Sequence, residues 1–456
     1  MKRTLADAAR ALGAVLAGED RPFGPVSSDT RTLGPGELFV ALRGPHFDAN
    51  DFVAEAERRG AAGAIVERRQ PIALPQIVVP DALAALTALA RAWRGQFSLP
   101  MVGVAGSNGK TTVKEMTSAI LGQRGPCLAT RGNLNNHIGV PLTLMRLEPQ
   151  HVSAVIEMGA NRAGDIAQLV ELARPTVGLV TNAGAEHLEG FGSLEGVARA
   201  EGEMFTSLGG GDTVVINADD RFATLWREFA GARAAVTFGV ERPADFRARD
   251  LRQRIDAQGF ALEFTLVAPA GERRVCLRLA GRHNVVNALA AAAAACAAGA
   301  QLDDCVRGLE SMRAVRGRLE LKTAGNGAAI IDDSYNANPS SVRAAIDVLS
   351  EIGGSTWLVL GDMAELGEFG VESHAEIGRY ARSRGVARLF ATGALARHSA
   401  EAYGAGAEWF ADVDALTHKL AASLSPTDTV LIKGSRINRL ERVVEALTRP
   451  PFMHAS

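Results

Sequence analysis

Short apolar runs alternate with amphipathic stretches through the middle of the chain. The apolar runs are typical of buried strands, and they lie at residues 101–105, 152–158, 177–181 and 213–217. Helical patterns, such as those at 165–173 and 193–208, separate these runs. Because strands that alternate with helices are typical of a parallel sheet, the pattern predicts an α/β layer with helices on both faces.

Related patterns occur on both sides of this region. Short strands, helices and Gly-Pro turn signals at 26–79 predict a small α/β unit. Near 246–280 strands follow one another without helices, which predicts an antiparallel extension of the central sheet. A Rossmann-like alternation follows, with strands expected at 328–331, 356–360, 388–391 and 429–432. We therefore expect an α/β protein of three domains, which span residues 1–82, 83–312 and 313–456.

Charge and cysteine usage narrow the class of protein. Lys+Arg 49 against Asp+Glu 51 gives a net charge of −2, which argues against a nucleic-acid partner. The 4 cysteines show no CxxC spacing, so a disulfide scaffold or a thiolate zinc site is not expected. The longest apolar run, at 288–298, falls short of the ~20 residues that a membrane helix needs. We expect a cytoplasmic monomer that does not insert into membranes.

A glycine-containing loop follows the first central strand. Residues 102–112 read VGVAGSNGKTT, so an apolar strand leads to a helix start through Gly106, Ser107, Asn108, Gly109, Lys110, Thr111 and Thr112. Backbone N–H groups in such a loop and at a helix N-terminus bind anions. Lys110 is placed to reach the β- and γ-phosphates of ATP or GTP, and Thr111 to offer its hydroxyl to Mg²⁺.

The loop departs from the strict phosphate-loop pattern, which has glycine where Val104 stands. The alternative is an ordinary strand–turn–helix with an exposed lysine. Only 6 of the 49 basic residues are lysines, however, so a lysine in this loop indicates that a compact ammonium is needed there. The sequence therefore predicts a nucleotide site.

Two further residues have the chemistry of magnesium partners. Glu157 ends one predicted central strand, and His187 follows the next. Both would lie at the carboxyl edge of a parallel sheet, where ligands bind. A carboxylate and an imidazole beside a phosphate loop suit Mg²⁺ in an ATP-dependent step, although each alone is also typical of a solvated strand end or loop.

Segments throughout the chain resemble the Mur ligase family of peptidoglycan synthesis. They are SSDTR (27–31), GELFVALRGPHFDANDF (36–52), GNLNNHIGVPLTL (132–144), EMGAN (157–161), NAGAEHLEGFGS (182–193), GRHNVVNALAA (281–291), DDSYNANPSS (332–341), LGDMAELGE (360–368) and IKGSR (432–436). Three of these segments, at 132–144, 332–341 and 360–368, resemble motifs of one branch of the family. The ligases of that branch join D-alanyl-D-alanine to UDP-N-acetylmuramoyl-tripeptide. The resemblance implies a UDP-binding N-terminal domain, a central ATPase domain and a C-terminal ligase domain that closes over the incoming peptide.

The resemblance also implies roles for residues at the nucleotide. Lys110, Glu157, His187 and Arg318 would be catalytic, and Arg318 would reach the ATP phosphates from the C-terminal domain when the domains close. Asn284 would read the adenine, although an Asn at a helix start is also typical of a local cap. Asp333 would contact the nucleotide.

Substrate-binding residues are implied in all three domains. Ser27, Ser28, Asp29 and Arg31 would hold the UDP diphosphate. The muropeptide path would be lined by Asn133, Asn135, Asn136, Asn336 and Asn338, although Asn-Pro at 338–339 also predicts a plain turn. The ends of D-alanyl-D-alanine would be held by Asp362, Glu365, Lys433, Ser435 and Arg436.

The implied reaction forms an acyl phosphate from the tripeptide carboxylate and ATP, with Mg²⁺ as the metal, and then an amide. Three alternatives remain open at this point. They are a related ligase acting on another muropeptide or on folate, a non-catalytic nucleotide-binding protein on a ligase scaffold, and a nucleic-acid-binding ATPase. The net charge argues against the last.

Glu201 is the strongest departure from the family pattern. Residues 200–203 read Ala-Glu-Gly-Glu, where relatives have a lysine that CO₂ converts to a carbamate and that helps bind a second Mg²⁺. We expect the Glu201 carboxylate to replace the carbamate with weaker Mg²⁺ binding. The alternative is a solvated helix glutamate, or an altered residue in this particular chain, with activity impaired. Two smaller departures are Asn50, where relatives often have His, and His137, where they often have an acidic residue.

Overall fold

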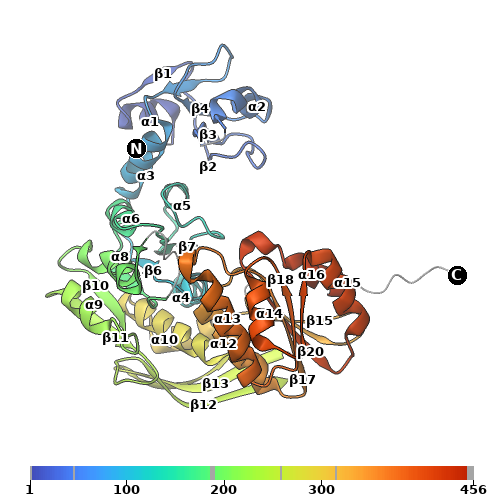
Figure 1. Ribbon diagram of the computed structural model, residues 1–456. Helices are drawn as coiled ribbons and strands as arrows, with labels where there is room; N and C mark the ends of the chain where they lie inside the picture. Colours follow the sequence, from blue (N-terminus) through green and yellow to red (C-terminus); the bar gives the residue numbers. More distant parts are fainter. Residues whose placement is uncertain (1–2, 45–46, 185–190, 257–258, 314–315, 449–456) are drawn as a thin grey trace.

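Four sheets form the framework of the molecule in the computed structural model, which describes residues 3–44, 47–184, 191–256, 259–313 and 316–448. Figure 1 shows an N-terminal unit that stands apart from a larger body, which the central and C-terminal regions form together. Each sheet lies within one of the three expected ranges, and the mixed α/β class is confirmed. The domain limits themselves stay a prediction.

The N-terminal sheet has the strand order β1-β5-β4-β3-β2, and only β1 pairs antiparallel. Its strands are β1 Val15–Ala17, β2 Val26–Ser27, β3 Leu38–Val40, β4 Gly63–Val66 and β5 Gln76–Val78. Its helices are α1 Leu5–Ala11, the 3-10 helix η1 Ala49–Phe52 and α2 Val53–Arg58. Buried apolar side chains of the strands and helices form its core.

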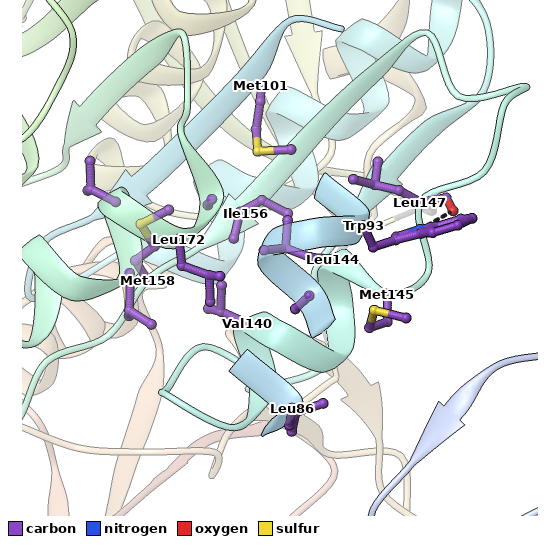
Figure 2. Close-up of a cluster of buried hydrophobic side chains, with 14 of the residues drawn as sticks. Leu86, Trp93, Met101, Val140, Leu144, Met145, Leu147, Ile156, Met158 and Leu172 are labelled. Carbon is purple, nitrogen blue, oxygen red and sulfur yellow. Dashed lines mark hydrogen bonds between the residues drawn. The ribbon is translucent and has the colours of Figure 1, made fainter. Parts of the chain in front are cut away.

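Helix α3 (Ala82–Arg94) joins this unit to the central region. The Asp81 side chain accepts hydrogen bonds from the N–H groups of Leu83 and Ala84, so it caps the N-terminus of the helix. The apolar face of α3 packs against α1 and against α5 (Gly139–Leu144). Figure 2 shows the shared cluster, in which Trp93 donates from Nε1 to the Leu147 carbonyl at 3.0 Å.

The central sheet is parallel throughout and has the strand order β11-β10-β9-β6-β8-β7. Its strands are β6 Met101–Ala105, β7 Cys127–Ala129, β8 Ser153–Glu157, β9 Val177–Val180, β10 Thr213–Asn217 and β11 Ala234–Phe238. The helices of the region are α4 Lys110–Leu121, α6 Asp165–Ala173, α8 Leu194–Thr206, α9 Ala223–Ala230, α10 Arg282–Ala297 and α11 Leu302–Ser311. The short 3-10 helix η2 is Gly122–Arg124.

The expected antiparallel extension of this sheet is wrong. Strands β12 (Arg247–Asp256), β13 (Gly259–Ala268) and β14 (Gly271–Leu277) form a separate three-stranded sheet. Among the described residues, an isolated bridge pairs Phe238, at the end of β11, with Phe246, which precedes β12. Each strand pairs antiparallel with its neighbour in sequence, β13 turns into β14 at residues 269–270, and the inner side chains of the sheet pack on α10 and α11.

The C-terminal sheet has the order β15-β16-β20-β17-β18-β19, and only β15 pairs antiparallel. Its strands are β15 Glu320–Thr323, β16 Ala329–Asp333, β17 Ser355–Leu360, β18 Arg388–Thr392, β19 Ala407–Phe410 and β20 Asp428–Lys433. Its helices are α12 Pro339–Ile352, η3 Gly367–Phe369, α13 Gly370–Ser383, α14 Ala396–Tyr403, α15 Val413–Ser423, η4 Arg436–Asn438 and α16 Glu441–Thr448. Among the described residues, no helix has the length and apolar character needed to cross a membrane.

Candidate functional site

A cavity of about 680 Å³ lies between the central and C-terminal regions. The central region lines it with the loop between β6 and α4 and with the start of α10, and the C-terminal region with the segment between β16 and α12. Both contributing sheets are largely parallel, and both present their carboxyl ends there. This is the edge at which open α/β sheets bind ligands.

The phosphate loop lies between Ala105, which ends β6, and Lys110, which begins α4. Gly106 has φ 116° and stands so close to β9 that a Cβ would come within 2.2 Å of Thr181 Oγ1. Glycine is therefore required at this position by both conformation and space. The Lys110 ammonium donates to the Ser107 carbonyl at 3.0 Å and also to the Gly106 carbonyl.

Protein acceptors hold the first amides of this loop. Ser107 N donates to the Asn182 carbonyl at 2.9 Å, and Asn108 N to Asn182 Oδ1 at 3.0 Å. The N–H groups of the first turn of α4 have no acceptor within the helix. The N-terminus of α4 is thus the part of the loop best placed to bind phosphate oxygens.

Glu201 lies behind the phosphate loop. It stands on α8 with 1% of its surface exposed, and its Oε2 accepts a hydrogen bond from Gly106 N at 2.7 Å. The alternative of a solvated helix glutamate is therefore wrong, because burial behind the loop excludes it. A metal role for Glu201 stays a prediction.

Glu157 ends β8 and is buried within the cavity wall. Its Oε1 accepts from Asn135 Nδ2 at 2.9 Å and from Thr111 Oγ1 at 3.3 Å, and its backbone N–H donates to Thr130 Oγ1 at 3.0 Å. Its Oε2 is buried without a hydrogen-bond partner. An unpartnered buried carboxylate oxygen is costly unless a cation meets it.

The residues at Glu157 fit Mg²⁺. Within the described parts of the chain, no three His, Cys, Asp or Glu side chains form a metal-binding group. Magnesium is nevertheless usually bound by one or two carboxylates together with substrate phosphates and water. The Glu157 Oε2 and the Thr111 hydroxyl supply such a partial set. His187, the other expected metal residue, lies outside the described residues.

Arg318 reaches from the C-terminal region to the phosphate loop. Its Nη2 donates to Thr111 Oγ1 at 3.1 Å, and its guanidinium lies 4.5 Å from the centre of the Tyr335 ring. The same Tyr335 ring lies 5.8 Å from the Arg436 guanidinium. Tyr335 therefore positions two arginines by cation–π contact, a role that the sequence analysis missed.

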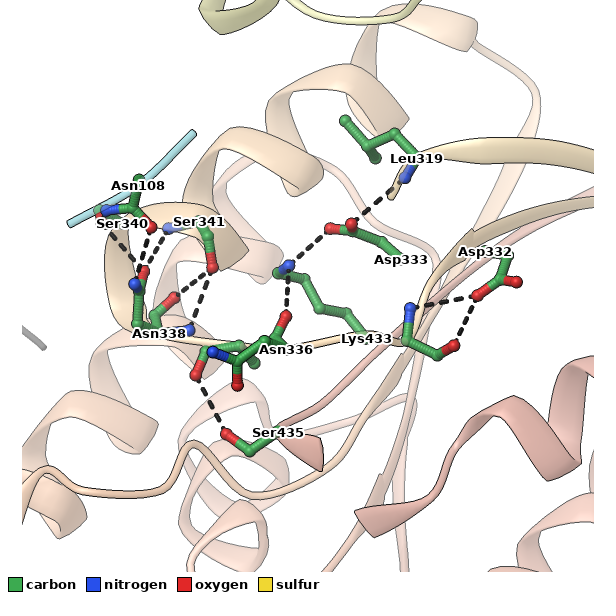
Figure 3. A network of polar contacts seen from close by, with 12 residues as sticks. Asn108, Leu319, Asp332, Asp333, Asn336, Asn338, Ser340, Ser341, Lys433 and Ser435 are labelled. Carbon is green, nitrogen blue, oxygen red and sulfur yellow. Dashed lines mark hydrogen bonds and ion pairs between the residues drawn. The ribbon is translucent and has the colours of Figure 1, made fainter. Parts of the chain in front are cut away.

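A buried ion pair fixes the segment that follows β16. Lys433 Nζ lies 2.6 Å from Asp333 Oδ2 and donates to the Asn336 carbonyl at 3.0 Å (Figure 3). Leu319 N donates to Asp333 Oδ1 at 3.2 Å. Burial raises the pKa of the Asp333 carboxyl, and the Lys433 charge opposes that rise. Asp333 and Lys433 both line this cavity. Lys433, expected to hold the dipeptide, does not line the smaller cavity described below, because its ammonium is paired with Asp333.

The start of α10 lies against the phosphate loop, where a Cβ on Gly109 would come within 2.5 Å of Asn287 Oδ1. Asn284 donates from Nδ2 to the Ala280 carbonyl at 2.7 Å and accepts at Oδ1 from Asn287 Nδ2 at 3.0 Å. Burial, aided by the Lys433 charge, lowers the pKa of His283 to about 4, so this imidazole is neutral at pH 7. Neutral polar groups of this kind suit an uncharged base.

A second cavity of about 270 Å³ adjoins the first in the C-terminal region. Both cavities are lined by Asn133, Tyr335, Asn336, Ala337 and Asn338, and the second adds Ala364, Glu365, Ser435, Arg436 and Ile437. Glu365 and Arg436 place opposite charges on its wall. Ser435 holds two wall segments of this cavity together, since its hydroxyl donates to the Ala337 carbonyl at 3.1 Å and accepts from Ala364 N at 2.9 Å.

Two expected substrate residues have structural contacts instead. Asp362 Oδ1 accepts from the N–H groups of Leu395 and Ala396 at 3.0 and 2.7 Å, at the start of α14. Asn136 Oδ1 accepts from the N–H groups of Ile138 and Gly139, before α5. Neither Asp362 nor Asn136 lines either of the two cavities described above, because each side chain is turned to a helix start.

The residues expected to bind UDP all lie in the N-terminal unit. Ser27 ends β2, and Ser28, Asp29 and Arg31 follow it. Arg31 forms an ion pair with Asp29 at 2.7 Å, and Ser27 Oγ accepts from Asp29 N at 3.2 Å. None of the four lines either cavity. Figure 1 shows the N-terminal unit set apart from the body that the central and C-terminal regions form.

Lys114 is a buried residue that the sequence analysis did not single out. Its side chain is fully buried on α4, and Nζ donates to the Thr130 carbonyl at 2.9 Å. Thr130 in turn accepts from Glu157 N, so Lys114 ties the phosphate-loop helix to the segment that holds Glu157. The scarcity of lysine in this chain was the available signal.

Comparison with known proteins places this geometry in a family. Residues 104–295 match the Mur ligase middle domain, and residues 317–436 match the Mur ligase, glutamate ligase domain. The UDP-N-acetylmuramoyl-tripeptide–D-alanyl-D-alanine ligase of Escherichia coli (strain K12) is 44% identical over 447 residues, which cover 97% of this chain and 98% of that protein.

Solved structures give the same result. The crystal structure of MurF from Acinetobacter baumannii superposes with a TM-score of 0.89 at 33% identity and covers 97% of this chain and 98% of that one. MurF ligase from Thermotoga maritima, solved in complex with ADP, has a TM-score of 0.79 at 29% identity, covering 93% and 97% of the two chains. The resemblance inferred from the sequence is confirmed, and the chain belongs to the Mur ligase family.

Proposed function

We propose that this protein is an ATP-dependent ligase that joins D-alanyl-D-alanine to UDP-N-acetylmuramoyl-tripeptide through an acyl phosphate. The observation that carries the proposal is the meeting of the phosphate loop, Glu157 and Arg318 in one interdomain cavity. Relatives named for this activity align with nearly the whole chain. We expect the enzyme to act in the cytoplasm as a monomer.

The first step is transfer of the γ-phosphoryl group to the tripeptide carboxylate. The N-terminus of α4 binds the phosphates, and Lys110 exchanges its loop carbonyls for phosphate oxygens. Arg318, held against Tyr335, neutralises charge that develops on the transferred group. Mg²⁺, when bound at Glu157 and Thr111, screens the charge of the ATP phosphates. His187 and Glu201 belong to the same proposed metal environment.

The second step is attack of the dipeptide amine on the acyl phosphate, which expels phosphate. The smaller cavity suits the dipeptide, because Glu365 offers a carboxylate to an ammonium group and Arg436 a guanidinium to a carboxylate. Its shared wall with the ATP cavity, at Tyr335, Asn336 and Asn338, would bring the amine to the reacting carbon. Enclosure between two domains keeps water from the acyl phosphate.

The remaining expected residues complete the proposed substrate path. Asn133 and Asn135 line the cavity, and Asn135 donates to Glu157, where the end of the tripeptide would arrive. Asn284, which lines the same cavity, would meet the adenine. Ser27, Ser28, Asp29 and Arg31 would hold the UDP group on the N-terminal unit. Asp362 and Asn136 are proposed only as supports of this path, given their contacts with helix starts.

A substrate panel tests the function directly. Phosphate release from ATP is measured with UDP-muramoyl dipeptide and tripeptide, each with and without D-alanyl-D-alanine. We expect turnover only with the tripeptide and D-alanyl-D-alanine together, because both cavities must be filled. Turnover with the UDP-muramoyl dipeptide and a single amino acid would indicate a related ligase. ATP binding without turnover on any pair would indicate a non-catalytic nucleotide-binding protein.

Lys110→Arg tests the phosphate loop. The substitution keeps the charge but replaces a compact ammonium with a planar guanidinium, which does not fit against Gly106 and Ser107. We expect kcat to fall by more than about tenfold, which corresponds to ~1.4 kcal/mol of transition-state stabilisation. Steady-state kinetics at saturating ATP measure the change. A variant that keeps more than about a tenth of the wild-type rate contradicts the role.

Glu201 variants separate a metal role from a role in loop structure. Glu201→Gln keeps an acceptor for Gly106 N but removes the charge, so a metal role predicts about a tenfold or larger rise in the Mg²⁺ concentration needed for half-maximal rate. Glu201→Ala also removes the acceptor, and a buried N–H without a partner is costly. We therefore expect Glu201→Ala to lower metal-free ADP affinity below that of Glu201→Gln.

The same residue allows a second comparison. Glu201→Lys restores the residue of the relatives, and its rate is measured with and without bicarbonate, with Glu201→Gln as the control. We expect bicarbonate to raise the rate of Glu201→Lys alone. Unchanged Mg²⁺ dependence in both Glu201→Gln and Glu201→Ala excludes the metal role.

A further inference from the structure

Asn108 belongs to the phosphate loop, yet its side chain bonds to the C-terminal region. Its Nδ2 donates to Ser340 Oγ at 2.9 Å, and its Oδ1 accepts from Asn338 Nδ2 at 2.7 Å. Figure 3 shows Asn108 against the start of α12, with Asn338, Ser340 and Ser341 around it. The amide nitrogen and the amide oxygen of the Asn108 side chain therefore both form hydrogen bonds with the C-terminal region.

The backbone of Asn108 is held by the central region alone. Its N–H donates to Asn182 Oδ1 at 3.0 Å, and its carbonyl accepts from Thr181 Oγ1 at 2.7 Å and from Asn182 Nδ2 at 2.9 Å. These three hydrogen bonds fix the backbone of Asn108 in the central region. The loop is therefore rigid when Asn338 and Ser340, the partners of the Asn108 side chain, move. The loop cannot follow the C-terminal region without breaking contacts with Thr181 and Asn182.

The partners on α12 are equally fixed. Asn338 is the N-cap of the helix, where its Oδ1 accepts from Ser341 N at 2.9 Å and Ser341 Oγ accepts from Asn338 N at 3.0 Å. Ser340 Oγ also donates to Asn338 Oδ1 at 3.0 Å. This reciprocal capping fixes the direction of the Asn338 amide, so its Nδ2 is directed at Asn108.

The geometry points to Asn108 as a latch, by which we mean that its hydrogen bonds to Asn338 and Ser340 hold the C-terminal region closed against the phosphate loop. The segment that carries Asn338 also carries Asp333 and Tyr335, and Tyr335 supports Arg318. Holding the start of α12 against the loop therefore holds Arg318 within reach of Thr111. Asn108 acts here as a positioning residue. The inference rests on the proposed function only in assigning a nucleotide to the loop, because closure is measured without turnover.

A double-mutant cycle tests the latch. Interdomain fluorescence transfer between dyes on α9 and α15 gives the ratio of closed to open molecules for wild type, Asn108→Ala, Ser340→Ala and the double variant. We expect Asn108→Ala to lower the ratio about three- to tenfold, as the loss of two neutral hydrogen bonds implies. Ser340→Ala should lower it less, and adding it to Asn108→Ala should have no further effect.

Matched controls make the result decisive. Ser350→Ala removes a hydroxyl from the same helix that donates to the Asp347 carbonyl and accepts from Arg384 Nη2, and both partners belong to the C-terminal region. This variant should leave closure unchanged. Thermal unfolding midpoints show whether each variant is folded, and Asn108→Ala should unfold within a few degrees of wild type. Additive effects of Asn108→Ala and Ser340→Ala overturn the latch. So does a fall in kcat in Asn108→Ala with an unchanged ratio of closed to open molecules.

Discussion

Two parallel sheets with their carboxyl ends at one cavity impose the main constraint on this molecule. Strands β6 and β8 bring Lys110 and Glu157 to that cavity, and β16 and β20 bring Asp333 and Lys433. Neither sheet alone has both a phosphate loop and a second set of charges. The proposed chemistry therefore depends on contacts between the domains, such as the hydrogen bond from Arg318 Nη2 to Thr111 Oγ1. The same constraint explains why the second cavity shares a wall with the first.

The buried charged residues of the site position neighbouring segments more than they stabilise the fold. The Asp333–Lys433 pair lies in the interior, where the cost of desolvation offsets much of the Coulomb attraction. Its effect is to fix the Asn336 segment between the two cavities. Glu201 Oε2 accepts from Gly106 N of the loop, whereas Glu157 Oε2 is buried without a hydrogen-bond partner. The carboxylate best placed for a cation is thus Glu157.

Much of the fold and the nucleotide site could be predicted from the sequence. A strand that is buried on both faces has a continuous apolar sequence, and this pattern predicted β6 and β10. The spacing of the glycines predicted the phosphate loop. The separate sheet of β12–β14 was not predictable, because hairpin strands and sheet-edge strands have the same local pattern. The contacts of Asp362, Tyr335 and Asn108 depend on partners far away in sequence, so no local pattern reveals them.

The most direct measurement of interdomain catalysis uses Arg318→Ala. Its kcat is compared with wild type, and the Kd of UDP-N-acetylmuramoyl-tripeptide is measured for both proteins in parallel. Because Arg318 belongs to the C-terminal region and the proposed UDP residues to the N-terminal unit, we predict a fall in kcat of at least about a hundredfold, or ~2.7 kcal/mol, with Kd changed less than about threefold. Equal losses in kcat and in affinity would contradict a catalytic site divided between the domains.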